Sequence, residues 1–152
     1  MITNLDSLLY QAEEKYLGQK ELANFKSQIF SLEKRLQTYE ILRAKEADIF
    51  EYINSHLANS FPDEPESKLE RALKQWLMIT RYCGMAMLSE NSSYLEQRVL
   101  EWLPEQIEAY DLKELEQVLF SYLAKRLKKV LNPEQLAMFQ PYLKQAQNAL
   151  LK

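Results

Sequence analysis

The sequence contains few of the residues that form tight turns, with two glycines and five prolines among 152 residues. A β-sheet needs a turn between most neighbouring strands, and glycine and proline supply most of these turns. A mainly β structure is therefore excluded, and long helices joined by few connections are favoured. Hydrophobic residues make up 47% of the chain, which is too many for a disordered protein. The length is that of one domain with a sizeable core.

Cysteine and histidine each occur once, as Cys83 and His56. A single cysteine cannot form an internal disulfide and suits a reducing compartment, so we expect a cytoplasmic protein. A lone histidine cannot build a multi-histidine metal site, and we expect His56, near a helix end, to be structural. The sequence has no CxxC, no HExxH, no glycine-rich phosphate loop and no nucleophile elbow. We therefore expect no enzymatic activity, no catalytic residue and no metal.

Long apolar runs and a strong charge bias are also missing. No run approaches the roughly 20 apolar residues of a membrane span, and the first residues, MITNLDSLLYQAEEKY, lack the pattern of a signal peptide. The formal net charge is only −3, which argues neither for nor against nucleic acid. The basic run AKRLKK, residues 124–129, is interpreted as the solvated end of a helix, where cations offset the helix dipole. We expect neither nucleic-acid binding nor membrane insertion.

Apolar residues recur every three or four positions over most of the chain, which is typical of amphipathic helices. Between residues 22 and 39 the steps of three and four alternate, as in the seam of two packed helices. The charged stretch RAKEAD, residues 43–48, is a candidate bend, and FPDEPES, residues 61–67, is the clearest linker. A short helix is expected from Tyr94 to Trp102, with Pro104 marking a break or a new first turn.

Helix ends are marked by capping residues. The candidate N-caps are Thr3, Ser67, Ser93, Asp111 and Asn132, each three residues before an acidic or amide side chain. Gly18 is the expected C-terminal stop of the first helix, because glycine adopts the left-handed conformation at little cost. These signals predict an all-α protein with an N-terminal helical hairpin and a bundle of about five or six helices. The first arm of the hairpin is short and needs a partner surface to bury its apolar stripe.

A resemblance emerges between residues 69 and 112. The sequence LERALKQWLMITRYCGMAM, followed by SSYLEQRVLEWLPEQIEAYDL, resembles phycobiliproteins, the light-harvesting globin relatives of cyanobacteria. YLEQRVL is similar to the short helix that follows their bilin-carrying helix, with Leu95 and Arg98 in register. The segments LGQKEL, RLQTYEILRAKEADI and NSFPDE resemble the family's N-terminal hairpin, first globin helix and F-P turn.

The resemblance covers nearly the whole chain and implies a globin-like helical bundle with an N-terminal two-helix extension, as in phycobilisome proteins. Residues 1–152 would form a single phycobiliprotein-like globin domain, with the hairpin and first long helix in residues 1–45 and the remaining globin helices in residues 64–152. The additional N-terminal helices pair subunits in phycobiliproteins. This implies a homodimer through those helices, or pairing with bilin-pathway or phycobilisome proteins.

The chain departs from the family at the residues that hold the chromophore. With Tyr82 aligned to the family's tyrosine, the bilin-attaching cysteine falls on Leu69 and the aspartate that binds the pyrrole nitrogens falls on Ala72. Only Arg71 remains of that motif, so no covalent bilin attachment is expected. Cys83 is fourteen residues from Leu69, about 21 Å along a helix. We interpret Cys83 as a small apolar residue of the core.

No histidine occurs between Tyr94 and Trp102, where a globin's proximal histidine is expected, so we expect no haem. The closest resemblance is to the bilin-biosynthesis-associated globins, small cyanobacterial proteins that lack the attaching cysteine. It implies a non-enzymatic protein associated with bilin metabolism or phycobilisomes, and with photosynthesis, that has no tightly bound cofactor. A haem-based sensor globin and an unrelated helical adaptor are the alternatives.

Two mechanisms stay open. In the first, the protein binds a bilin transiently and non-covalently, with cations that pair with its propionates and aromatic residues that pack on its rings. The expected contacts are Arg71, Lys74, Trp76, Arg81, Tyr82 and Tyr110. In the second, the protein is an interaction module whose pocket is filled by flexible side chains. The candidate filling residues are Met78, Met85, Met87 and Leu88.

Overall fold

The computed structural model describes residues 3–109 and 112–151, and all regular structure in this part of the chain is helical. The elements are α1 (Thr3–Glu14), α2 (Gln19–Ser60), α3 (Glu66–Ser89), α4 (Ser92–Leu95), the π-helix η1 (Glu96–Leu100), α5 (Leu103–Ala109), α6 (Lys113–Val130) and α7 (Pro133–Leu150). The predicted all-α class is confirmed.

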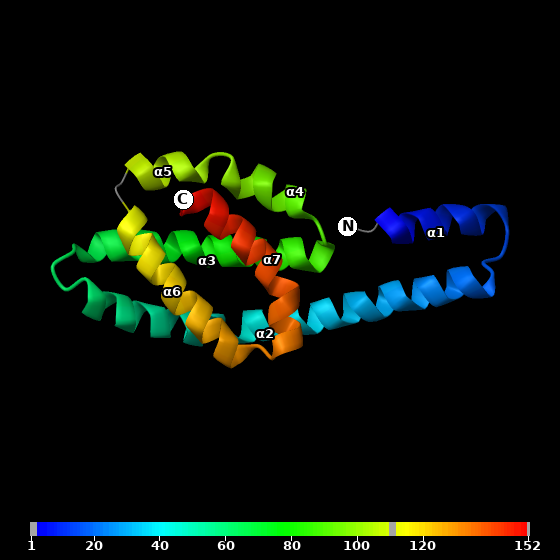
Figure 1. The fold of residues 1–152 in the computed structure, drawn as a ribbon, viewed down its shortest axis with the longest axis horizontal. Coiled ribbons are helices and arrows are strands. Elements are labelled where there is room, and N and C mark those ends of the chain that lie inside the picture. Colours follow the sequence, from blue (N-terminus) through cyan, green and yellow to red (C-terminus); the bar gives the residue numbers. More distant parts are fainter. Residues whose placement is uncertain (1–2, 110–111, 152) are drawn as a thin grey trace.

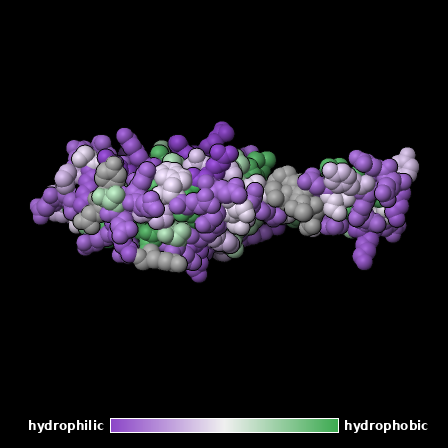
Figure 2. All heavy atoms as spheres, turned by 90° about the horizontal axis from the view of Figure 1, so that it is seen from above, coloured by the Kyte–Doolittle hydropathy of each residue, from purple (hydrophilic) through white to green (hydrophobic). Residues whose placement is uncertain are grey.

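Two parts can be distinguished in the molecule (Figure 1). Helix α1 and the first part of α2 form a hairpin that projects from one end, and the rest of α2 runs along a bundle made with α3 to α7. Figure 2 shows the same hairpin from above as a narrow lobe beside the larger body. Among the described residues, none of the helices combines the length and the hydrophobicity that a membrane span requires.

Helix α2 is 42 residues long and continues through residues 43–48, so the charged stretch RAKEAD, the candidate bend, does not interrupt the helix. The reason is that Leu42 and Ile49, on either side of this stretch, are both buried and lie seven residues apart. Seven residues are close to two helical turns, so the buried stripe passes through the charged segment without interruption. No proline or glycine occurs between residues 19 and 60 to break it.

Helix α3 lies at the centre of the bundle and packs against α2, α6 and α7. Its buried side chains include Trp76, Ile79, Cys83 and Met87. The interpretation of Cys83 as a core residue is confirmed: it is fully buried, and burial raises the pKa of its thiol. Because the thiolate is the reactive form, this cysteine is chemically inert in the folded protein.

One of the predicted N-caps is confirmed. Asn132 accepts a hydrogen bond from the Gln135 N–H at 2.8 Å, and the Gln135 side chain accepts one from the Asn132 N–H at 3.1 Å. The caps at Ser67 and Ser93 are wrong, because α3 begins at Glu66 after Pro65, and α4 is capped by the side chain of Asn91. Helix α1 starts at Thr3, so this residue is inside the helix rather than before it. Asp111 lies outside the described residues.

The expected C-terminal stop at Gly18 is also wrong. Helix α1 ends at Glu14, and Gly18 is the N-cap of α2 with a φ of −74°, which is not left-handed. The left-handed residue is Glu90, with a φ of 49°, where α3 ends. Arg35 of α2 is 6% exposed, donates to the carbonyl oxygen of Leu88, and has its Nε 3.5 Å from the Glu90 carboxylate. This arginine ties the end of α3 to α2.

The short helix predicted from Tyr94 to Trp102 is present as α4 followed by η1. Pro104 lies in the first turn of α5, as predicted. In η1 the Glu101 N–H donates to the Glu96 carbonyl at 3.1 Å, which is the wider i to i+5 spacing of a π-helix.

Candidate functional site

The charged residues predicted as bilin contacts lie on the outside of α3. Arg71 and Lys74 are exposed. Arg81 is also exposed, and its guanidinium makes two hydrogen bonds to the Glu46 carboxylate of α2, at 2.7 and 3.0 Å. This pairing with Glu46 raises the pKa of Arg81. Arg81 therefore faces α2.

The predicted aromatic contacts lie elsewhere. Trp76 is fully buried, donates its Nε1–H to the Glu116 carboxyl group of α6, and packs on Phe120 with ring centroids 5.4 Å apart. Tyr82 is half-buried beside Tyr94, with ring centroids 5.8 Å apart. Trp76 faces α6 while Arg81 faces α2, so the structure does not bring these two predicted contacts together. Tyr110 lies outside the described residues.

The positions aligned with the family's chromophore-holding residues belong to the hydrophobic core. Leu69 is 7% exposed and Ala72 is fully buried. Of the proposed filling side chains, only Met87 is in the core, Met78 is half-buried, and Met85 is 37% exposed. Leu69, Ala72 and Met87 are therefore part of the hydrophobic core.

Glu116 is a buried acid that the sequence reasoning missed. It is fully buried between α6 and α3, and desolvation raises the pKa of its carboxyl group to about 8, although the hydrogen bond from Trp76 acts in the opposite direction. Its Oε1 atom accepts no hydrogen bond from the described residues. The sequence did hold a signal, because Glu116 is four residues after Leu112 and three before Leu119 and so lies on the apolar stripe.

His56 packs in an aromatic cluster between α2 and α6. Its Nδ1 is 2.8 Å from the Tyr52 carbonyl oxygen, and its ring centroid is 4.1 Å from that of Tyr52 and 5.3 Å from that of Tyr122. Two members of the basic run, Lys125 and Arg126, lie over the Tyr122 and Tyr52 rings. No group of three or more His, Cys, Asp and Glu residues suited to a metal ion occurs in the described part of the chain.

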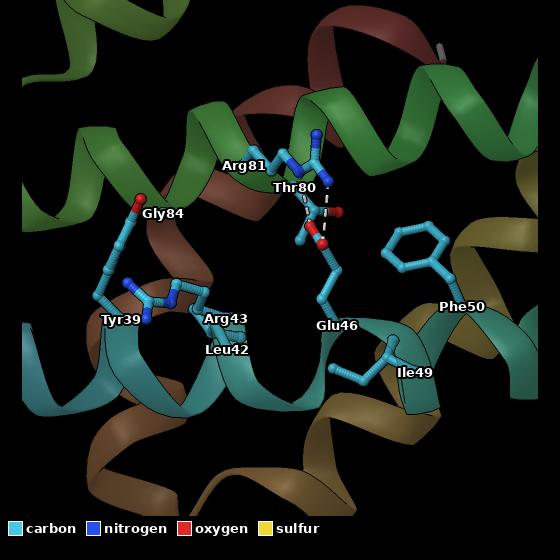
Figure 3. Close-up of a pocket in the computed structure, with 9 residues that line it drawn as sticks. All are labelled: Tyr39, Leu42, Arg43, Glu46, Ile49, Phe50, Thr80, Arg81 and Gly84. Carbon is cyan, nitrogen blue, oxygen red and sulfur yellow. Dashed lines mark hydrogen bonds and ion pairs between the residues drawn. The ribbon is translucent and has the colours of Figure 1, made fainter.

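A pocket opens between α2 and α3 at the Arg81–Glu46 pair (Figure 3). Its volume is about 270 Å³. The pocket is lined by Tyr39, Leu42, Arg43, Glu46, Ile49, Phe50, Thr80, Arg81 and Gly84. Leu42 and Ile49 form a buried apolar floor, and the charged groups of Arg43 and the Arg81–Glu46 pair lie at the rim.

The hairpin exposes large hydrophobic side chains. We call this set the hairpin surface; it consists of Leu9, Tyr10, Tyr16, Leu22, Ile29, Phe30 and Leu36. Leu8 packs α1 against α2 and is 3% exposed, whereas its neighbour Leu9 is 56% exposed. The hairpin therefore packs part of its apolar surface internally and leaves the seven side chains of the hairpin surface open to solvent.

Taken together, the helical hairpin and the bundle around a central α3 define a globin-like protein with an N-terminal two-helix extension. The model of the phycobilisome protein family matches residues 8–150. The chain belongs to the phycobilisome protein family, so the resemblance to phycobiliproteins and the globin-like fold are confirmed at the level of the family. A comparison with curated proteins gave no match.

Family membership also sets a general context. Phycobilisome proteins are typically non-enzymatic light-harvesting proteins, their chromophore is a bilin, and they assemble with one another. The alternative of an unrelated helical adaptor is wrong, because the family match extends over nearly the whole chain.

Proposed function

We propose that this chain is a non-enzymatic phycobilisome-family protein that acts in the cytoplasm by protein–protein association. It forms a homodimer through its N-terminal helices, or uses these helices to pair with phycobilisome proteins or with bilin-pathway proteins. The bilin-pathway partners follow from the resemblance to the bilin-biosynthesis-associated globins. The observation that carries the proposal is the hairpin surface. Exposed large apolar side chains that gather on one part of a molecule mark interaction sites when they form a patch, and seven of them occur between residues 9 and 36.

The spacing of the hairpin surface suits a helical partner. Leu22, Ile29 and Leu36 are seven residues apart and are 44%, 42% and 44% exposed. A repeat of seven keeps apolar side chains along one seam when two helices pack together. A second copy presents the same stripe, which allows the self-complementary contact that a two-fold dimer needs.

The start of α3 also supports association rather than chromophore carriage. Leu69 stands where the family's attaching cysteine is expected, and both Leu69 and Ala72 are packed in the core. The aspartate that would pair with a protonated tetrapyrrole is absent from the Ala72 position, and this weakens any bilin binding.

The test of the homodimer is the mass in solution, measured by light scattering over a wide range of protein concentration. We expect the native chain to be a dimer and Ile29→Glu to be a monomer, because a carboxylate in an apolar seam must give up its hydration. Gln37→Glu is the matched control, since it adds the same charge at an exposed polar position of α2. A monomeric native chain at every concentration would overturn the homodimer.

Transient, non-covalent bilin binding is the second candidate function, and it is favoured by membership of a bilin-carrying family. Arg71 and Lys74 are exposed cations on α3 that are able to pair with propionates. Titration of biliverdin and phycocyanobilin with visible absorbance tests this candidate. A saturable shift of the long-wavelength band that is weaker in Arg71→Ala than in Lys129→Ala supports it, and a flat response rejects it. A Soret band in the purified protein would instead indicate a haem-based sensor globin.

A further inference from the structure

The pocket between α2 and α3 has the size of a small-molecule site. Its volume is about 270 Å³, and a cavity of about 150 Å³ is enough to hold a benzene molecule. Gly84 contributes to this space, because it brings no side chain to the wall of the pocket opposite Tyr39. A Cβ atom added at Gly84 would lie 3.5 Å from the Tyr39 ring, in ordinary van der Waals contact.

The lining combines an apolar floor with a charged rim. Leu42 and Ile49 are 8% and 1% exposed, and the Phe50 side chain lies farther along the same helix (Figure 3). This floor suits a flat or compact hydrocarbon group, as is usual for small-molecule pockets. The hydroxyl of Thr80 already donates to the Trp76 carbonyl at 2.7 Å, so its oxygen is left to accept.

The uncompensated charge of the pocket is positive. Glu46 is the acidic residue in the lining, and both of its oxygens are engaged by Arg81. Arg43 lies one helical turn before Glu46 and makes no ion pair with the described residues. A guanidinium group at the rim of an apolar pocket matches a carboxylate, which it binds through two parallel hydrogen bonds.

We infer that the α2–α3 pocket binds a small carboxylate with a compact apolar body, and that Arg43 pairs with the carboxylate while Tyr39 and Leu42, on the same side of the Arg81–Glu46 pair, contact the body (Figure 3). The site lies on the α2 side of α3, away from Leu69 and Ala72. It shares Arg81 with the predicted bilin contacts, but Arg43, which carries the proposed ion pair, is not one of them.

The probe is benzoate, and its neutral counterpart of the same shape is benzamide. Amide chemical shifts of the isotope-labelled protein are followed in a titration with each compound at constant ionic strength. We expect saturable shifts at residues 39–46 and 80–84, with a dissociation constant on the order of 1 mM for benzoate. Benzamide should bind about tenfold more weakly, because it cannot form the ion pair.

Three variants complete the test. Arg43→Gln should reduce benzoate binding to the level of benzamide, whereas Lys45→Gln, which removes the same charge at an exposed position nearby, should leave it unchanged. Gly84→Leu should weaken both probes by filling the pocket, and the amide spectrum shows whether it remains folded. Equal affinity for the two probes, or benzoate binding that survives Arg43→Gln, would overturn the inference. Benzoate binding that disappears as the protein dimerises would also overturn it, because the pocket would then belong to the subunit interface.

Discussion

The carboxyl group of Glu116 lies in an apolar layer between α3 and α6, fully removed from solvent. Desolvation raises its pKa to about 8, so near neutral pH it is mostly protonated and uncharged. One oxygen accepts from Trp76 Nε1–H, and the other has no hydrogen-bond partner among the described residues. A buried acid of this kind is tolerated as a neutral group but not as an anion.

The pH dependence of stability follows from this residue. The unfolded chain releases the Glu116 proton near pH 4.5 and the folded protein near pH 8. The folded state thus binds more protons between these values, and the free energy of unfolding falls as pH rises, by up to about 1.4 kcal/mol per pH unit. Below about pH 4.5 this contribution is fully present, and above about pH 8 it has been lost.

Urea unfolding at several pH values between 5 and 9 measures this effect. Glu116→Gln should remove the decline in the free energy of unfolding with rising pH. It should leave the protein more stable than the native chain at the alkaline end of this range. The control is Glu114→Gln on the exposed face of the same helix, which should keep the native slope. Parallel slopes for the native protein and Glu116→Gln would show that another group is responsible.

At the scale of the elements, α7 has the best-defined start. Asn132, Pro133 and Gln135 form a capping box with proline in the first turn. Each side-chain cap satisfies backbone N–H groups that have no partner within the helix. Because α7 packs against the central α3, its stability contributes to that of the bundle.

We expect Asn132→Ala to lower the free energy of unfolding by about 1 kcal/mol. The measurement is urea or thermal unfolding at fixed pH. Asn148→Ala places the same change at an exposed position in the last turn of α7, where alanine favours the helix, and should be neutral or slightly stabilising. An equal loss in the free energy of unfolding in the two variants would show that the Asn132 cap makes no separate contribution to stability.

The helices themselves could be predicted from the sequence, because the apolar stripes that define them are also the surfaces that pack. The stripe from Leu42 to Ile49 also continues α2 without a break through the charged segment RAKEAD. Helix ends were harder to predict. A cap contributes only about 1 kcal/mol, so nearby residues such as Pro65 and Asn91 replaced the expected Ser67 and Ser93.

Single buried polar groups were the hardest to predict. Arg35 and Glu116 have residue types that are usually exposed, and each is buried only because a distant segment supplies its partner. The α2–α3 pocket likewise depends on how two helices pack, and Arg43 in its rim has no distinguishing sequence pattern. Of the predicted bilin contacts, Trp76 and Arg81 were expected to lie together, but they face different helices.

At the scale of the whole molecule, the bundle has its own core while the hairpin surface is left uncovered. If two copies cover it, folding is coupled to association. The melting temperature should then rise with protein concentration, because mass action favours the dimer and not the unfolded chains.

We expect this rise for the native chain and for Gln37→Glu, but not for Leu36→Glu, whose new carboxylate would lie in the seam. Thermal unfolding followed by circular dichroism at several concentrations provides the measurement. A melting temperature that is independent of concentration in all three proteins would argue against association through the hairpin.

The continuity of α2 links these two parts mechanically. Its 42 residues form one rod of about 63 Å, with the hairpin surface near one end and the bundle along the other. A partner that binds the hairpin therefore also fixes the orientation of the bundle. One residue inserted in the middle of α2 would rotate the bundle about the helix axis by about 100° relative to the hairpin. Seven inserted residues would restore nearly the original orientation. The number of residues in α2 therefore determines the rotational angle between the bundle of this protein and a partner bound to its hairpin.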